Sequence, residues 1–281
     1  MLWQGRRESS NVEDRRGLSG GHIAVGGGIG SLIIGLIIYL LGGNPSQVIN
    51  SGPSSDVQQS PQEQQAEDQE SQFVRVVLAD TEDVWSKLFS DMNKQYVDPT
   101  LVMFTESTES GCGFASAATG PFYCPTDQKV YIDLSFFQEM KDRFQAAGDF
   151  AQAYVIAHEV GHHVQNLLGI TRQVDAQHGR LSETQMNRLS VKLELQADFL
   201  AGVWAHYDEK MKNVIQPGDI DEALNAANAI GDDRLQKESQ GYVVPDAFTH
   251  GTSQQRMYWF KKGYTTGDIS QGDTFNDPSL Q

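Results

Sequence analysis

Apolar residues recur at the spacing of a helix face over several long segments of the chain. In residues 73–96, Val77, Val84, Leu88 and Met92 fall on one face of a predicted helix. Similar patterns dominate the second half of the chain and predict helices over residues 135–144, 149–168, 183–210, 219–237 and 253–262. The runs LVMFTES (101–107) and KVYIDLS (129–135) are typical of strands. A small sheet followed by a series of helices predicts an α+β domain.

A long apolar stretch precedes this domain. Residues 23–41, IAVGGGIGSLIIGLIIYLL, carry no charge, and as a helix they would span about 28 Å, close to the hydrocarbon thickness of a bilayer. Four arginines precede the stretch, and the next basic residue is Arg75. The positive-inside rule predicts a cytoplasmic segment over 1–22, one inner-membrane anchor over 23–43 and a periplasmic or extracellular remainder. A cleaved signal peptide is the alternative, although no A-x-A-like site follows.

The segments that flank the domain are polar. Residues 44–72 are rich in Pro, Ser, Gln and acidic residues, and they have too few apolar side chains to offset the entropy of ordering, so they predict a disordered linker. Residues 265–281 are again polar and predict a flexible tail. The folded domain is therefore predicted to occupy residues 73–264.

The charge balance argues against a nucleic-acid partner. The chain has 21 Lys and Arg residues against 37 Asp and Glu residues, which gives a formal net charge of −16. Neutralising phosphates requires clustered basic side chains, and none is apparent in the sequence. The sequence indicates no particular oligomeric state.

Two cysteines, Cys112 and Cys124, bracket the Gly-rich segment GCGFASAATGPFYC. A disulfide that closes this short loop would stabilise a domain in an oxidising compartment. The alternatives are two unrelated thiols or a pair of metal ligands, but no histidine stands near either cysteine. The disulfide is the favoured interpretation.

The motif HEVGH lies inside the predicted helix 149–168. His158 and His162 are four residues apart, so both imidazoles project from one face and can bind a single tetrahedral zinc ion. Glu159 lies beside them and is placed to act as the general base toward water. Gly161 costs about 1 kcal/mol relative to Ala inside a helix, so its presence predicts that another element approaches closely. These residues predict a zinc-hydrolase site.

A third ligand is expected from the segment LELQADFLAGVWAHY. Glu194 and Asp198 are four residues apart on a face that otherwise carries alanines. Two carboxylates on such a face are costly unless a cation or hydrogen bonds compensate them. We expect Glu194 to ligate zinc and Asp198 to accept a hydrogen bond from a ligating histidine; the reverse assignment is the alternative.

The segment THGTSQQR contains two further residues of interest. His250 is a candidate for stabilising the oxyanion of the transition state, although a structural role at the start of the next helix is an equal alternative. Arg256 is expected to be a structural ion-pair partner. A peptide substrate would bind as an extended strand, along either residues 129–134 or residues 115–122.

Several segments together resemble one bacterial protein family. They are MLWQGRRESSNVEDRRG with the Gly-rich span after it, GPFYCPTDQKVYIDLSFF, YVIAHEVGHHVQNLLG, LELQADFLAGVWA, GDIDEALNAANAIGDDRLQ and FTHGTSQQRMYWF. The combination is similar to the neutral zinc metallopeptidases of bacteria, and HExxH followed by ExxxD looks like the gluzincin type of zincin. The resemblance implies a zincin-like fold, a bacterial envelope location, and one zinc held by His158, His162 and Glu194. It also implies Glu159 as base and Asp198 behind the ligands.

The sequence therefore predicts a membrane-anchored, zinc-dependent endopeptidase that hydrolyses peptide bonds outside the cytoplasmic membrane. One alternative is a silent scaffold or binding protein that keeps the zinc fold, but a structural zinc site does not need a base such as Glu159. Another is a zinc hydrolase of a non-peptide amide in the cell envelope. The natural substrate is not predicted.

Overall fold

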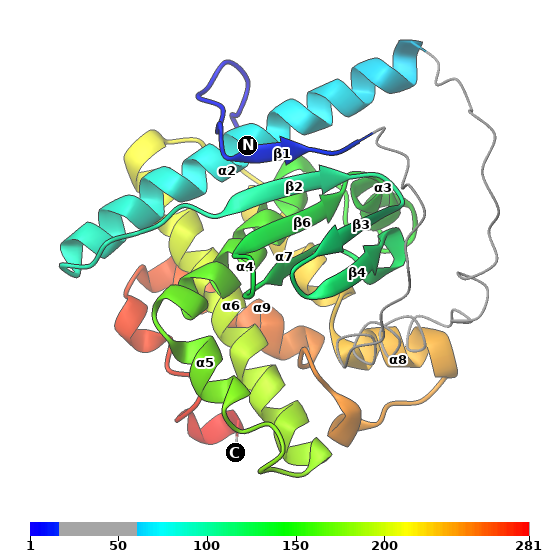
Figure 1. Cartoon of the computed structure of the whole chain (residues 1–281), viewed down its shortest axis with the longest axis vertical. Helices are drawn as coiled ribbons and strands as arrows, with labels where there is room; N and C mark the ends of the chain where they lie inside the picture. Colours follow the sequence, from blue (N-terminus) through cyan, green and yellow to red (C-terminus); the bar gives the residue numbers. More distant parts are fainter. Residues whose placement is uncertain (17–60, 281) are drawn as a thin grey trace.

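The structure is a computed structural model that describes residues 1–16 and 61–280. It has a mixed α+β fold that is mostly helical, with two small sheets (Figure 1). The strands are β1 Val12–Asp14, β2 Thr100–Phe104, β3 Ser107–Ser110, β4 Gly113–Ser116, β5 Phe122–Cys124 and β6 Lys129–Asp133. The helices are α2 Pro61–Asp91, α3 Ser135–Asp142, α4 Asp149–Leu167, α5 Ile170–Asp175, α6 Glu183–Lys212, α7 Asp219–Ala229, α8 Asp232–Gln240 and α9 Ser253–Thr266.

The main sheet has the strand order β1-β2-β6-β5. β1, β2 and β6 run parallel, and β5 runs antiparallel to β6. β6 is therefore paired along both edges, whereas β5 forms an outer strand of this sheet. β3 and β4 form a separate hairpin between β2 and β5 in the chain.

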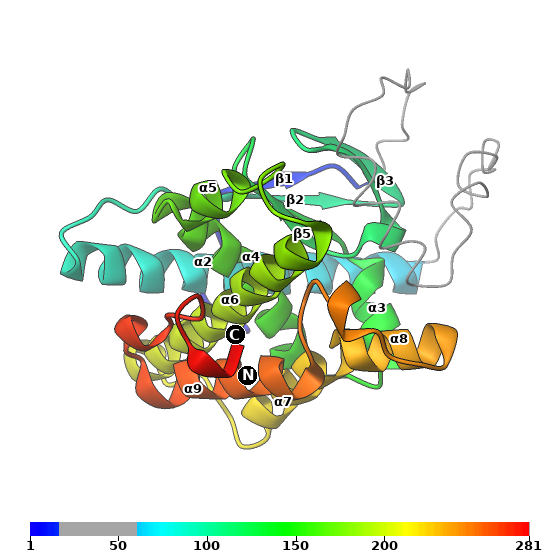
Figure 2. The same ribbon diagram turned by 90° about the horizontal axis from the view of Figure 1, so that it is seen from below.

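Helix α4 lies at the centre of the fold. It contacts β5 and β6 on one side and α6 and α7 on the other, so that it joins the sheet to the helical layer (Figures 1 and 2). Its side chains from Phe150 to Ala157 are almost all buried. This burial explains why the segment has apolar residues all round rather than on a single stripe.

Small residues let these helices approach closely. A Cβ atom placed on Gly161 of α4 would lie 3.0 Å from the carbonyl oxygen of Ala197 on α6. The expectation of a close neighbour at Gly161 is therefore confirmed. A Cβ on Gly263 of α9 would lie 2.0 Å from the carbonyl oxygen of Phe199, so α6 and α9 are nearly in backbone contact. These approaches bring side chains from three helices to one place.

The N-terminal segment packs against the domain. β1 extends the sheet beside β2, and Arg6 lies 2.7 Å from Asp80 of α2. The prediction of a cytoplasmic segment 1–22, separated from the domain by a membrane, is wrong for residues 1–16 because they contact the domain directly. Nowhere in the described ranges does a helix combine the length and apolar character needed to cross a membrane. The predicted anchor over 23–43 lies outside the described residues.

The predicted linker and tail are corrected in part. Residues 61–72, predicted as disordered, form the start of α2. They are rich in Gln and Glu, which are good helix formers, and they continue into the apolar part of the same helix. The tail predicted as flexible from 265 onward is ordered to residue 280, because Thr274 is fully buried and its hydroxyl donates to the carbonyl of Lys192 at 2.6 Å. The polar composition of both segments therefore gave no sign that they are ordered.

Most predicted helices and both predicted strands are present. The helix predicted over 219–237 is instead divided into α7 and α8 at Gly231. A Cβ at this position would lie 2.3 Å from the backbone nitrogen of Ser253, so the chain turns there to admit the start of α9. The short elements β1, β3, β4, β5 and α5 were not predicted, because their apolar patterns are too brief to stand out.

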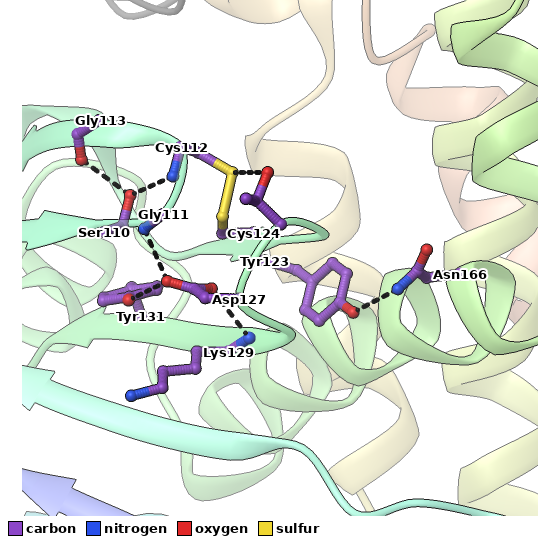
Figure 3. The surroundings of a disulfide bond; sticks show 11 residues. Ser110, Gly111, Cys112, Gly113, Tyr123, Cys124, Asp127, Lys129, Tyr131 and Asn166 are labelled. Carbon is purple, nitrogen blue, oxygen red and sulfur yellow. Dashed lines mark hydrogen bonds between the residues drawn. A yellow bond between two sulfur atoms is a disulfide. The ribbon is translucent and has the colours of Figure 1, made fainter.

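The predicted disulfide between Cys112 and Cys124 is confirmed (Figure 3). Cys112 lies in the turn of the β3–β4 hairpin and Cys124 ends β5. On the same strand, the Tyr123 hydroxyl lies 3.0 Å from Asn166 Nδ2 and 3.0 Å from His163 Nδ1, both on α4. β5 is therefore fixed to the hairpin on one side and to α4 on the other.

Candidate metal centre

The structure brings His158 and His162 of α4 to Glu194 of α6. His158 Nε2 lies 3.1 Å from one carboxylate oxygen of Glu194, and His162 Nε2 lies 3.3 Å from the other. One ligand atom from each of the three residues falls within 4.8 Å of the other two. Two imidazole nitrogens and a carboxylate converge on one point, as the sequence predicted.

The donor set fits a zinc ion. Two histidines and one glutamate are a common set of protein ligands for catalytic zinc, and they leave a fourth position for water or substrate. The electrostatics also favour a cation here. Burial alone would lower the pKa of His158, but the carboxylates of Asp198 and Glu194 raise it to about 10. Burial opposes ionisation of Glu194 too, yet the two histidines hold its pKa well below its usual range.

Glu159 follows His158 on α4 and is buried, with 8% of its surface exposed. Burial raises the pKa of its carboxyl group, although the neighbouring histidines partly oppose this. A carboxylate with a raised pKa is a better proton acceptor than a solvated one. The position and environment of Glu159 therefore suit the role of general base that the sequence predicted.

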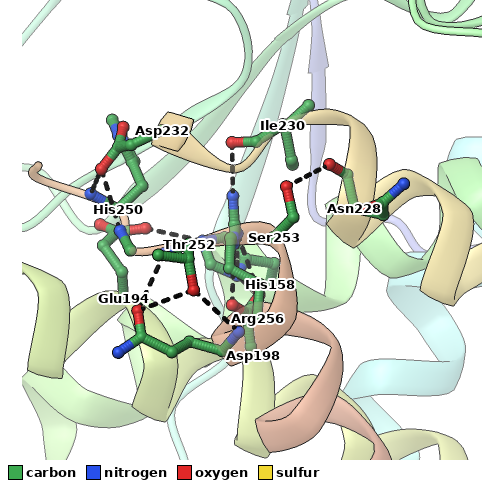
Figure 4. Close-up of polar contacts among 12 residues, drawn as sticks. His158, Glu194, Asp198, Asn228, Ile230, Asp232, His250, Thr252, Ser253 and Arg256 are labelled. Atoms are coloured by element: carbon green, nitrogen blue, oxygen red, sulfur yellow. Dashed lines mark hydrogen bonds and ion pairs between the residues drawn. The ribbon is translucent and has the colours of Figure 1, made fainter. Parts of the chain in front are cut away.

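Asp198 lies directly behind His158, as expected (Figure 4). Its Oδ1 accepts hydrogen bonds from His158 Nδ1 at 2.8 Å and from the Tyr154 hydroxyl at 2.5 Å. Arg256 of α9 donates to both oxygens of Asp198, at 2.8 and 2.9 Å. The hydrogen bond at Nδ1 directs Nε2 of His158 toward Glu194.

The guanidinium of Arg256 keeps the carboxylate of Asp198 ionised. Burial would raise the pKa of Asp198, but Arg256 and His158 lower it to about 2, so Asp198 is ionised. The sequence predicted only a structural ion pair for Arg256 and did not name its partner. The structure places it beside the proposed ligand His158, with Nη2 3.4 Å from His158 Nδ1.

His250 lies at the edge of the same site, beside Asp232 at the start of α8 (Figure 4). Asp232 Oδ2 accepts the backbone N–H groups of Thr249, His250 and Gly251, and its Oδ1 lies 3.1 Å from His250 Nδ1. Although burial opposes it, Asp232 raises the pKa of His250, and Glu194 adds to this effect. Asp232 therefore fixes both the loop and the imidazole.

Sequence reasoning missed Asp232 and Tyr154 as site residues. Tyr154 stands four residues before His158, on the same helix face, which is a usable signal. Asp232 has no such signal, because only the folded loop brings it to His250. Of the two segments considered for substrate binding, residues 129–134 are excluded because both edges of β6 are paired.

Two helices thus present a His-Glu-x-x-His set and a glutamate in the arrangement of a zinc-dependent hydrolase. Residues 1–275 match the family model described as "Putative neutral zinc metallopeptidase". The chain belongs to this family. The matched region begins at residue 1, so it includes the N-terminal segment that packs on the domain.

Similar proteins occur in several bacteria. The Escherichia coli protein YpfJ, described as uncharacterized, is 51% identical over 98% of this chain and 99% of its own length. The Mycobacterium tuberculosis protein Rv2575, also described as uncharacterized, is 42% identical over 70% of this chain and 68% of its own length. No solved structure gives a significant match.

Proposed function

We propose that this chain is a zinc-dependent endopeptidase. The observation that carries the proposal is the approach of two histidine Nε2 atoms, at 3.1 and 3.3 Å, to one carboxylate, with Glu159 on the same helix. A zinc ion held there by His158, His162 and Glu194 would polarise an amide carbonyl and activate water. A fold that kept the metal only for stability would not need a buried carboxylate beside it.

The protein groups take defined roles in this reaction. Glu159 accepts a proton from the attacking water and returns it to the leaving amine. His250, held by Asp232, donates a hydrogen bond to the oxyanion that develops on the carbonyl carbon's oxygen. Asp198 and Arg256 keep His158 in the tautomer whose Nε2 has a free lone pair.

An extended peptide would bind along β5. One edge of this strand pairs with β6, and no strand in the described part of the chain pairs with its other edge. Main-chain hydrogen bonds along such an edge bind peptides with little regard to sequence. The contacts of Tyr123 with α4 hold β5 in a fixed position relative to the helix that carries the two histidines. The disulfide also favours action in an oxidising compartment.

The test compares the zinc-loaded full chain with its Glu159→Gln variant on a disordered protein substrate. The wild type is expected to cleave it, and the variant to bind zinc but lose activity by about 10²- to 10⁴-fold, because its amide cannot accept the proton. Equal cleavage by both proteins would contradict the role of Glu159. Absence of cleavage by zinc-loaded wild type across disordered substrates would contradict the endopeptidase.

Glu194→Ala tests the ligand set separately. Loss of one of three protein ligands is expected to remove stable zinc binding, which metal analysis after gel filtration measures. Glu183→Ala, on the exposed first turn of the same helix, is the matched control and should retain one zinc per chain. Full occupancy in Glu194→Ala would show that Asp198 or another group is the ligand.

A further inference from the structure

His162, the second proposed ligand, is supported by a chain of amides rather than by a carboxylate. Its Nδ1 lies 2.9 Å from Gln165 Oε1. Gln165 Nε2 donates to Gln196 Oε1 at 3.1 Å, and Gln196 Nε2 donates to the carbonyl of Gly272 at 2.8 Å. The side chain of Gln165 is fully buried, and Gln196 is 8% exposed.

Each hydrogen bond in this series of side-chain amides has a defined donor and a defined acceptor. A ligating His162 must present an unprotonated Nε2, so its Nδ1 carries the proton and donates to Gln165. The Gln165 amide nitrogen then faces Gln196 and the carbonyl of Leu193, which it contacts at 2.7 Å. Gln196 must in turn offer its oxygen to Gln165 and its nitrogen to Gly272. Rotating either side-chain amide by half a turn would place two donors or two acceptors against each other.

The far end of the chain of amides belongs to the C-terminal segment. Residues 268–280 pass beside α6 and α9 (Figure 2), and Gly272 follows the 3₁₀ helix Ile269–Gln271. A Cβ atom on Gly272 would lie 2.5 Å from the ring of Phe199, which is fully buried and packs edge-on against Trp259. Only glycine therefore lets the backbone come near enough for its carbonyl to reach Gln196.

Gln196 is not enclosed on all sides. A cavity of about 650 Å³ between α5, α6 and the C-terminal segment has Gln196, Gly272, Leu200 and Phe275 in its wall. Its lining does not include His158, His162 or Glu194. The side chain of Gln196 thus lies between the buried Gln165 and an open cavity, so packing does not enclose this end of the hydrogen-bonded connection as it encloses Gln165.

We propose that Gln165 and Gln196 are positioning residues that couple the docking of the C-terminal segment to zinc binding through His162. The inference rests on the proposed zinc site. The segment acts by supplying the last acceptor of the relay, which is here the chain of hydrogen bonds His162–Gln165–Gln196–Gly272. When the carbonyl of Gly272 is in place, each amide is polarised and the Nδ1 hydrogen bond of His162 is strengthened.

The test is a double-mutant cycle in zinc affinity, measured on the full chain by competition with a chromophoric chelator. Gln165→Met is expected to weaken zinc binding about 10- to 100-fold, as loss of a hydrogen bond behind a ligand typically does. Gly272→Ala is expected to weaken it about fivefold, because the displaced backbone leaves Gln196 without its acceptor. In the Gln165→Met background, Gly272→Ala should have no further effect.

Independent, multiplicative effects of the two substitutions would overturn the relay, since a loosened fold would act on both backgrounds alike. The matched control is Thr274→Val, which removes a different side-chain hydrogen bond between this segment and α6 but no member of the relay. It should leave zinc affinity within about twofold of wild type. An effect as large as that of Gly272→Ala would also overturn the proposal.

Gln165→Glu provides a rescue variant. Its carboxylate accepts the Nδ1 proton of His162 but cannot donate to Gln196 or to the carbonyl of Leu193, so zinc affinity should recover only in part, to above that of Gln165→Met, while its sensitivity to Gly272→Ala disappears. Retained sensitivity in this background would contradict the relay. These measurements need no substrate. If zinc binds and the cycle shows coupling but no peptide is cleaved, the proposed activity fails while the relay stands.

Discussion

Helix α6 buries two aspartates, Asp198 and Asp208, in very different surroundings. Both side chains are fully buried. Asp198 accepts hydrogen bonds from Arg256, Tyr154 and His158, and its pKa is lowered to about 2. Asp208 has no hydrogen-bond partner for either oxygen among the described residues, and burial beside Asp80 raises its pKa to about 7. The same residue type is thus an anion at the middle of α6 and only about half ionised near pH 7 close to its C-terminal end.

The difference lies in how the available cations are distributed. Among the carboxylates that the structure describes, Asp198 alone lies within hydrogen-bonding distance of Arg256, whose planar guanidinium reaches both of its oxygens. Lys212, beside Asp208, lies closer to Asp80 and Asp83, at 2.7 and 2.8 Å, than to Asp208, at 3.5 Å. One ammonium therefore serves three carboxylates. Burial alone therefore does not decide the charge of a carboxylate; a dedicated cation and a neighbouring histidine keep Asp198 ionised.

The largest effect is expected from Arg256→Met, which takes the dedicated cation from Asp198. A buried charge that loses its partner typically costs about 3–5 kcal/mol of folding free energy. Denaturant unfolding with a chelator present measures this cost without a contribution from zinc. Adding Asp198→Asn to the variant should recover part of the loss, because the stranded charge is then gone. If Arg256→Met lost less than about 1 kcal/mol, Asp198 would not depend on Arg256 as its distances indicate.

Asp198→Asn and Asp208→Asn form a matched pair on one helix. Asp198→Asn weakens the hydrogen bond at Nδ1 of His158, so zinc affinity is expected to fall about 10- to 100-fold. Asp208→Asn should leave zinc affinity unchanged, because Asp208 contacts no proposed ligand. Chelator competition on both variants gives the comparison directly. Equal zinc affinities for the two would mean that Asp198 does not position His158.

The sequence was most informative where one helix fixes the geometry. His158 and His162 are one turn apart on any helix, so their convergence needed no tertiary information. Glu194 and Asp198 were predictable because carboxylates on a face of alanines require compensation. The fold class followed from the order of strand and helix patterns. For the two histidines and for the two carboxylates, the decisive neighbours lie within one segment.

Contacts between distant segments were not predictable in the same way. Arg256 reaches Asp198 only because Gly202 and Gly263 let α6 and α9 approach closely. The spacing of apolar residues does not indicate that these two helices pack together. The parallel pairing of β1 with β2 joins residues almost ninety positions apart. Arg6 and Arg7 contact α2 in the folded domain, whereas their sequence position beside an apolar stretch suggested a cytoplasmic flank. Basic residues near an apolar stretch indicate membrane topology only when they do not bind to a folded part of the same protein.

The smallest expected effect concerns the pH dependence of stability at Asp208. Its pKa is about 7 in the folded protein and about 4 in an unfolded chain, so the folded state binds more protons between these values. The free energy of unfolding therefore falls, through this group, as pH rises from about 4 to about 7, and the loss persists above that.

Asp208→Asn removes the ionisation, so it should stabilise the protein at pH 8, by on the order of 1 kcal/mol, relative to its effect at pH 5. Unfolding temperatures of wild type and variant at the two pH values measure this difference, with chelator present to exclude zinc. A variant with the same pH dependence as wild type would mean that Lys212 keeps Asp208 ionised throughout, and the contrast with Asp198 would then be one of hydrogen bonding alone.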